Sequence, residues 1–255
     1  MVGDARFGVP ERIETPYGVF NALADDLITG QLLAFGGHTR NELAMVLDHV
    51  AEGDVFVDLG AHIGTFAVPI AQKLGSRGKL LAIEGAPETF RLLERNIGAN
   101  GLAHRVQTRC VIVGEGDQQK LRRIEVGGNS GAGYYLPDPA GAVAAISARA
   151  LLCTQGFARF DFLKIDVEGM EWAVLQDLAP LIQTRRPKLY IEVVASQIAR
   201  FGATVGAIDA FLRAFGYRFY RNVGERNSSN DHYIKAELSG LEDGGEFFDL
   251  LALPE

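Results

Sequence analysis

The sequence predicts an α/β fold in which a mostly parallel sheet is covered by helices on both faces. From residue 55 onward, strand-like segments that are apolar throughout alternate with amphipathic helical segments. A strand without polar alternation is buried on both sides, which is typical of parallel sheets in α/β proteins. The second observation is the stretch VFVDLGAHIGTF (55–66), where an apolar strand runs directly into a turn with an acid and two glycines. In such folds the turns after the strands form the ligand-binding edge.

Residues 1–50 differ from the rest and are expected to form an N-terminal extension that caps the domain. RIETPYGVF (12–20) predicts a small hairpin with its turn at Pro16-Tyr17-Gly18, because proline and glycine favour tight turns. Short helical pieces follow, ending in NELAMVLDHV (41–50). The first fourteen residues contain no apolar run, so we expect no signal peptide.

The alternation then begins with three strands and two helices. Pro87 suits the first turn of the second helix and Gly101 suits its C-terminal cap. In chain order these elements are VFVD (55–58), a helix over Thr65–Leu74, KLLAIE (79–84), the helix PETFRLLERNIGAN (87–100) and RVQTRCVIV (105–113).

The second half continues the pattern after an interruption. Residues 114–150 include GGNSGAGYYLPDPAGA and predict a loop-rich excursion, and excursions of this length are functional or disordered. No linker or repeat divides the chain, so 51–255 is expected to be one domain. Its remaining elements are the strand FDFLKID (160–166), the helix GMEWAVLQDLAPLI (169–182), the strand KLYIEVV (188–194), a helix near TVGAIDAFLRAFG (204–216) and the strands YRFYRN (217–222) and FFDLLAL (247–253).

Composition bounds the function classes. The chain is 47% hydrophobic and 22% charged, as ordinary globular proteins are, and its net charge is −7. An acidic chain is a poor match for nucleic acid, which needs clustered Lys and Arg. No stretch approaches the ~20 apolar residues of a membrane span. Cys110 and Cys153 are too few for a disulfide framework and are expected to be free core thiols. We therefore expect a cytoplasmic protein, and composition leaves its oligomeric state open.

The turn after the first strand and the end of the second strand predict a nucleoside site. Gly60 and Gly64 leave the backbone bare for a ligand, and the following helix offers free N–H groups. Glu84 ends the next strand, where a carboxylate can accept both hydroxyls of a ribose. A nicotinamide dinucleotide usually brings G-x-G-x-x-G, whereas this turn reads D-x-G-x-x-x-G. Asp58 suits a cationic amino-acid group better than a pyrophosphate, which favours S-adenosylmethionine.

The stretch DFLKIDVEGME (161–171) is the other unusual segment. A central parallel strand should be apolar, yet Lys164 lies within it and Asp166 ends it, both on one face. A buried ammonium needs a partner, and Asp58 or Glu192 on flanking strands can supply one.

At this point the sequence resembles the FkbM-type methyltransferases. The resemblance is carried by VFVDLGAHIGTF, by the strand ending AIEG and by DFLKIDVEGMEWAVL, and it runs from about Asp25 to the final FFDLLALP. It implies a Rossmann-like class I methyltransferase fold with a seven-stranded, mostly parallel sheet, and S-adenosylmethionine as donor. The implied chemistry is O-methylation of a hydroxyl on a small molecule, a polyketide or a glycan. His62 stands where Asn is frequent, and SARALL (147–152) replaces a common Thr-Leu-Asp-Asp segment.

A hydroxyl acceptor needs a base or a metal ion to take its proton. Asp166 is the first candidate base, Glu168 and Glu192 are the next carboxylates, and His62 is either a base or a lining residue. If Asp166 and Glu192 converge, Mg²⁺ is conceivable, since it prefers oxygen ligands; otherwise these residues form a structural ion network with Lys164. The expected donor site consists of Asp58, Gly60, Ala61, His62, Gly64, Glu84 and Asp166.

Two other classes stay open on the sequence alone. One is a dinucleotide-binding oxidoreductase and the other is a protein that binds the donor without catalysis. The acceptor is expected to contact residues 1–50 and 114–150, where motifs are absent, so its identity does not follow from the sequence.

Overall fold

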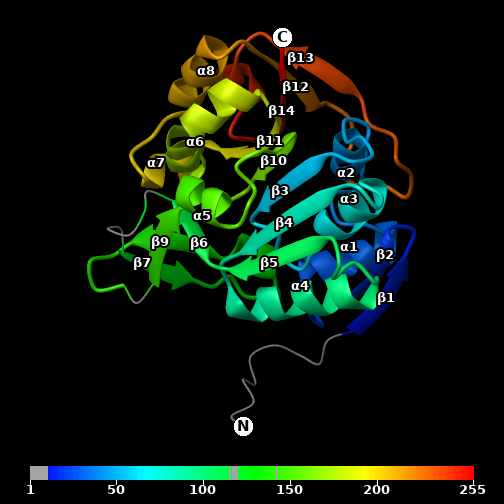
Figure 1. Cartoon of the computed structure of the whole chain (residues 1–255). Helices are drawn as coiled ribbons and strands as arrows, with labels where there is room; N and C mark the ends of the chain where they lie inside the picture. Colours follow the sequence, from blue (N-terminus) through cyan, green and yellow to red (C-terminus); the bar gives the residue numbers. More distant parts are fainter. Residues whose placement is uncertain (1–10, 115, 117–119, 142) are drawn as a thin grey trace.

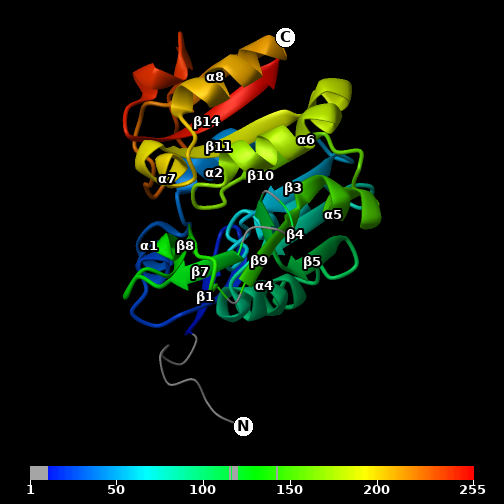
Figure 2. The same ribbon diagram turned by 90° about the vertical axis from the view of Figure 1, so that its left-hand side faces the viewer.

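The computed structural model describes residues 11–114, 116, 120–141 and 143–255. Residues 1–10 of the predicted extension and positions 115, 117–119 and 142 of the predicted excursion lie outside the described residues. Figures 1 and 2 show the described chain as a central sheet with helices on both of its faces.

The central sheet has eight strands, one more than the seven predicted. Five neighbouring strands are parallel, whereas β14 and the edge strand β13 run antiparallel to their neighbours. The extra strand is β13, a short polar segment that only its pairing with β12 reveals. In spatial order the strands are β13 (Lys235–Leu238), β12 (Tyr217–Asn222), β14 (Phe247–Pro254), β11 (Lys188–Val194), β10 (Phe162–Ile165), β3 (Val55–Leu59), β4 (Lys79–Glu84) and β5 (Val106–Cys110).

Side-chain alternation along these strands builds two cores, one on each face. Phe56, Phe162 and Tyr190 point into the core under the first four helices, while Val57 and Leu163 point into the other. The first core lies under α1 (Leu27–Phe35), α2 (Arg40–Leu47), α3 (Ala67–Lys73) and α4 (Pro87–Ala99), and the second lies under α5 (Ala148–Thr154), α6 (Glu171–Arg185), α7 (Ala195–Arg200) and α8 (Val205–Ala214).

The predicted hairpin is confirmed as β1 (Glu11–Thr15) paired with β2 (Gly18–Ala22). It joins α4 and its C-terminal cap through side-chain amides: Val19 N donates to Asn100 Oδ1 at 2.9 Å and Asn21 N donates to Asn96 Oδ1 at 2.6 Å. The extension is thus packed on the main domain.

The excursion contains a sheet of its own, so its description as loop-rich is wrong for much of its length. The predicted strand 105–113 breaks at Val111, and its second part turns into this sheet. The break lets the excursion fold back across the carboxyl edge of the main sheet. In spatial order the small sheet consists of β6 (Ile112–Gly114), β9 (Val143–Ser147), β7 (Lys120–Ile124) and β8 (Tyr134–Pro137), and a short helix η1 (Ser130–Ala132) precedes β8.

Cys110 and Cys153 are free thiols as predicted, but both are exposed. Their assignment to the core is therefore wrong. Cys110 lies at the end of the edge strand β5, where an inward-facing position is not guaranteed.

Candidate functional site

A cavity of about 410 Å³ opens at the carboxyl edge of the main sheet. It lies where the chain, having added β4 and β5 on one side of β3, returns to place β10 on the other. Such a reversal of strand order is where open α/β sheets bind their ligands. Its walls come from the ends of β3, β4, β10 and β11, from α1 and the turn before α2, and from the excursion.

The turn after β3 depends on glycine at two positions. Gly60 and Gly64 have φ angles of +87° and +90°. A Cβ on Gly60 would lie 1.8 Å from the carbonyl oxygen of Asp166, and a Cβ on Gly64 would lie 2.9 Å from Leu93 Cδ1. Both glycines therefore serve close packing, against the end of β10 and against α4. Gly60 also lines the cavity, whereas Gly64 does not.

His62 lies within this turn, between the two glycines, with a backbone in the left-handed region at φ +50°. Asn tolerates that conformation better than most residues do, which explains why Asn suits this position in the family that the sequence resembles. The imidazole Nε2 lies 2.9 Å from Ser130 Oγ in the excursion. Its Nδ1 is buried and has no hydrogen-bond partner among the described residues. Burial lowers the pKa of His62, so the ring is neutral.

Glu84 ends β4 and connects the glycine turn to α4. Its Oε2 accepts from His62 N at 2.8 Å, and its Oε1 accepts from Ala86 N at 2.8 Å and from Thr89 Oγ1 at 2.9 Å. A carboxylate has about four acceptor positions in all, so capacity for a further donor in the cavity remains. The following residue, Gly85, lets Ile112 and Tyr135 approach closely from the small sheet.

Lys164 lies at the centre of a buried ion network, as one of the sequence alternatives predicts. Its Nζ donates to Asp166 Oδ2 at 2.9 Å and to Gly60 O at 3.1 Å, and lies 3.4 Å from Asp58 Oδ1. Burial lowers the pKa of Lys164, but the two carboxylates outweigh it and raise the pKa above its usual value. Burial raises the pKa of Asp58 despite the lysine. Lys164 therefore stays charged, as does Asp166.

Three carboxylates meet beyond this network. Asp166, Glu168 and Glu192 each offer an oxygen, and these oxygens lie within 4.8 Å of one another. Burial favours the neutral form of Asp166, but Lys164 outweighs it and holds the pKa of Asp166 below its ordinary value. Burial, and then Asp166, raise the pKa of Glu168 to about 9 and that of Glu192 well above its usual value. Glu168 is therefore protonated at neutral pH, and the same causes favour the protonated form of Glu192, beside an ionised Asp166.

Glu171 holds the segment that carries these carboxylates, and the sequence interpretation missed it. Its Oε1 accepts from Val167 N at 3.0 Å and from Gly169 N at 3.1 Å, which fixes the turn between β10 and α6. Glu168 within that turn has φ +57° and is held by Gln197 Nε2 at 2.8 Å. A signal was present, since an acid just before an apolar helical run is typical of an N-terminal cap.

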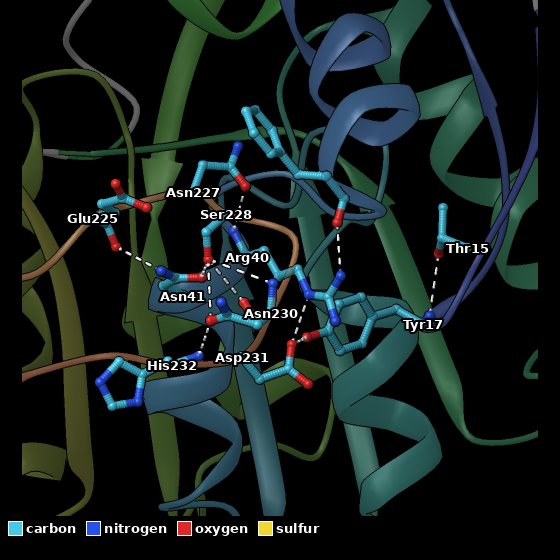
Figure 3. A network of polar contacts seen from close by, with 11 residues as sticks. Thr15, Tyr17, Arg40, Asn41, Glu225, Asn227, Ser228, Asn230, Asp231 and His232 are labelled. Carbon is cyan, nitrogen blue, oxygen red and sulfur yellow. Dashed lines mark hydrogen bonds and ion pairs between the residues drawn. The ribbon is translucent and has the colours of Figure 1, made fainter.

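The far wall of the cavity is assembled from two segments that are distant in the chain. Residues 225–231 lie across the start of α2, where Asn41 N donates to Arg226 O at 3.1 Å and Arg40 N donates to Asn227 Oδ1 at 3.1 Å. These bonds satisfy helix N–H groups that otherwise lack a partner. Figure 3 shows Asp231 between Arg40 and Tyr17, with bonds to both.

This network brings His38 and Arg226 into the cavity wall. Arg226 is paired with Asp249 Oδ2 at 2.5 Å. No sequence motif marks His38 or Arg226, because the contact between the start of α2 and residues 225–231 joins segments about 190 positions apart. His232 is exposed, and its ring is drawn at the edge of the network in Figure 3.

The structure brings most of the predicted site residues into one cavity. Asp58, Gly60, Ala61, His62, Glu84, Asp166 and Glu192 all line it, and Gly64 is the exception. The cavity wall also contains residues from 27–39 of the N-terminal extension and from 129–135 of the excursion. From the sequence, both regions are expected to contact the acceptor, but no motif there points to single residues.

No helix among the described residues has the length and apolar character needed to cross a membrane.

Comparison with known proteins gives a family match. The model of the family described as "Methyltransferase FkbM domain" matches residues 58–219. No curated protein matches the sequence.

Solved structures with a similar backbone fold include the following three methyltransferases. An FkbM methyltransferase from Methylobacillus flagellatus is 15% identical, with 78% of this chain and 43% of that chain covered and a TM-score of 0.47. An S-adenosylmethionine-dependent O-methyltransferase from Thermotoga maritima is 15% identical, with 96% and 86% covered and a TM-score of 0.44. A precorrin-6y C5,15-methyltransferase from Geobacter metallireducens is 11% identical, with 83% and 87% covered and a TM-score of 0.45.

Proposed function

We propose that this chain, which belongs to the FkbM methyltransferase family, methylates a hydroxyl group of a small molecule, a polyketide or a glycan. Family membership is the premise, since the family model covers residues 58–219, more than half of the chain. An S-adenosylmethionine-dependent methyltransferase is therefore established at the level of the family, and the oxidoreductase alternative is set aside. The choice of oxygen as the methylated atom, and the roles of single residues, are our proposal.

The observation that carries the donor assignment is a set of unsatisfied polar atoms at the cavity. Neither carboxylate oxygen of Asp58 has a well-formed hydrogen bond among the described residues, and His62 Nδ1 has none either. Buried polar atoms without partners are costly, and a ligand that supplies the partners removes that cost. S-adenosylmethionine fits, because its ammonium can donate to Asp58 and its carboxylate can accept from the turn.

Glu84 is proposed to hold the ribose hydroxyls, next to Gly60, Ala61 and His62. Gly64 shapes the same turn from outside the cavity, and Asp166 borders it at the acceptor end. When bound, the donor supplies a methyl group on a positively charged sulfur. The residues of this chain align that group with the acceptor oxygen and exclude water, since alignment is the main requirement of an in-line displacement.

The acceptor is proposed to enter between the carboxylates and the wall formed by residues 27–39 and 225–231. Asp166, ionised and fixed by Lys164, can accept a hydrogen bond from an acceptor hydroxyl. Glu192, whose protonated form is favoured by burial, can donate one to a neighbouring oxygen. Polar lining of this kind suits an acceptor that carries several oxygens, and supports a hydroxyl as the methylated group.

Mg²⁺ fits this site poorly. The oxygens of Asp166, Glu168 and Glu192 are close enough for one ion. However, Lys164 Nζ already lies 2.9 Å from Asp166 Oδ2 and would repel a second cation. The comparisons give Mg²⁺ no support, so we derive no step through a metal. A chelator is expected to leave methyl transfer unchanged.

Isothermal titration with S-adenosylhomocysteine, the product of the donor, tests the proposal first. One binding site per chain is expected, with no binding of NAD. Turnover is then measured as S-adenosylhomocysteine formed from S-adenosylmethionine with a panel of sugars, polyols and phenols. Binding without turnover on any member would favour a donor-binding protein without catalysis.

Glu84→Ala is expected to weaken S-adenosylhomocysteine binding by about 1.5–3 kcal/mol, the range for a hydrogen bond to a charged group. Because Glu84 also accepts from His62, Ala86 and Thr89, the melting temperature should fall too. Titration is therefore done well below the melting temperature of the variant. Glu94→Ala, an exposed change on α4, is the control. Unchanged affinity in Glu84→Ala would exclude a ribose contact.

A further inference from the structure

His38 lies in the cavity wall between α1 and α2, and its ring is held in one orientation. Nδ1 lies 2.6 Å from Gln31 Oε1, and the same oxygen accepts from Asn227 Nδ2 at 2.9 Å. An amide oxygen carries no hydrogen, so His38 Nδ1 is the donor in this pair. In a neutral ring the lone pair is then on Nε2. Among the described residues, no protein group bonds to His38 Nε2.

The backbone around His38 is fixed from both sides. Arg40 Nη1 donates to Phe35 O at 2.7 Å and closes the segment between the two helices. Thr39 has φ +43°, and residues 225–231 cap α2 immediately after it. Figure 3 shows Arg40 and Asn227 within this network. The position of the ring is therefore set by the fold rather than by a flexible loop.

The other titratable groups at this end of the cavity are less suited to receive a proton. Asp166 is committed to Lys164 at 2.9 Å, and Asp249 is committed to Arg226 at 2.5 Å. Glu168 carries a proton at neutral pH, and burial and Asp166 favour the protonated form of Glu192. His62 Nε2 is engaged with Ser130, and its Nδ1 is buried.

We infer that His38 is a catalytic residue, whose Nε2 takes the proton of the acceptor hydroxyl during methyl transfer. The inference rests on the proposed O-methylation. A lone pair of the hydroxyl oxygen forms the new C–O bond, and the pair of the broken C–S bond stays on the sulfur of the donor. The pair of the O–H bond stays on oxygen, and the proton goes to the lone pair of His38 Nε2.

The weak basicity of this imidazole is compatible with that role. Burial, and then His62, Arg226 and Lys164, lower the pKa of His38 to about 3, against an opposing effect of Asp166. An oxygen that is gaining a methyl group becomes far more acidic than the starting alcohol, so a weak base suffices late in the reaction. The kcat–pH profile should then lack a limb near the ordinary histidine pKa of ~6.5.

Two measurements test the inference. Nitrogen NMR of ¹⁵N-histidine-labelled protein should show His38 as the Nδ1–H tautomer at neutral pH, with an Nε2 signal that moves when S-adenosylhomocysteine binds. With the best hydroxyl compound of the panel, His38→Gln should lower kcat by ~10²-fold, the low end of the range for general bases. Donor KM and S-adenosylhomocysteine affinity should stay unchanged. Free imidazole should restore part of the activity of His38→Ala.

The control is His232→Gln, an exposed change in the loop between β12 and β13, which should keep wild-type turnover. A ring protonated on Nε2 in the wild-type protein, or a His38→Gln variant with wild-type kcat, overturns the inference while leaving the proposed function intact. A wild-type protein that binds S-adenosylhomocysteine and methylates no hydroxyl compound overturns the proposed function, and the role of His38 falls with it. The tautomer measurement needs no variant, so it can overturn the inference even if both His38 substitutions unfold the protein.

Discussion

Replacing Lys164 by methionine is expected to lower the free energy of unfolding by ~3–5 kcal/mol, the range for removing one partner of a buried ion pair. Lys164 is 4% exposed and Asp58 is fully buried. Without the ammonium, Asp58 and Asp166 face each other with no neutralising charge. Methionine fills most of the same volume beside Phe66, so the loss arises from charge rather than from a cavity.

The pH dependence of this variant separates the charge effect from a packing effect. Once Lys164 is gone, the folded-state pKa of Asp58 rises further above that of the unfolded chain. The folded variant then binds more protons than the unfolded chain, so its stability rises as pH falls. The deficit relative to wild type should therefore shrink between pH 8 and pH 5. Chemical denaturation at both pH values measures it, with Lys73→Met on the exposed side of α3 as control. A deficit below about 1 kcal/mol, the size of a surface ion pair, would contradict the prediction.

The parts of the fold that follow from sequence are those in which local pattern and tertiary burial agree. β3, β4, β10 and β11 are buried on both faces, so their apolar runs identify them without knowledge of their neighbours. β13 reads KAEL and is exposed or half-buried throughout, so its sequence resembles a loop. Its pairing with β12 is the only property that makes it a strand. The small sheet of the excursion was missed for the same reason.

The proposed donor half of the site was predictable because it is concentrated at two strand ends. Asp58, Gly60 and Glu84 follow from the rule that parallel strands present their carboxyl ends at one edge. The proposed acceptor half depends on contact between residues 31–41 and 225–231, and no spacing in a single sequence reports that contact. The only local signal at His38 is the pair of glycines before it, and the polar run that packs beside it lies far along the chain. Lys164 was recognisable because a charge within an apolar strand conflicts with its surroundings.

Among substitutions in the glycine turn, Gly60→Ala is expected to have the largest effect on stability and on S-adenosylhomocysteine binding. A methyl group there would lie 1.8 Å from Asp166 O, and the backbone at φ +87° is unfavourable for alanine. Backbone strain and overpacking each cost ~1–3 kcal/mol, which together lowers the free energy of unfolding by ~2–6 kcal/mol. Since the carbonyl belongs to the residue directly after β10, relief of the clash must separate the end of β10 from the turn. Asp58 and Glu84 would then lose their common geometry, so S-adenosylhomocysteine binding should be lost even in the fraction that remains folded.

Gly98→Ala provides the matched control, because Gly98 lies in α4 and a Cβ there meets no atom within 4 Å. That change should raise stability by ~0.5–1 kcal/mol, since alanine favours the helix over glycine. Thermal unfolding and titration of both variants separate two explanations of Gly60. If Gly60→Ala lost donor binding but kept wild-type stability, the glycine would be needed for the ligand and not for the contact with β10. If it kept both, the close approach of the turn to Asp166 would not exist in solution. The expected loss of both follows from one contact: Asp166, directly after β10, and the turn proposed to bind the donor approach so closely that no methyl group fits between them.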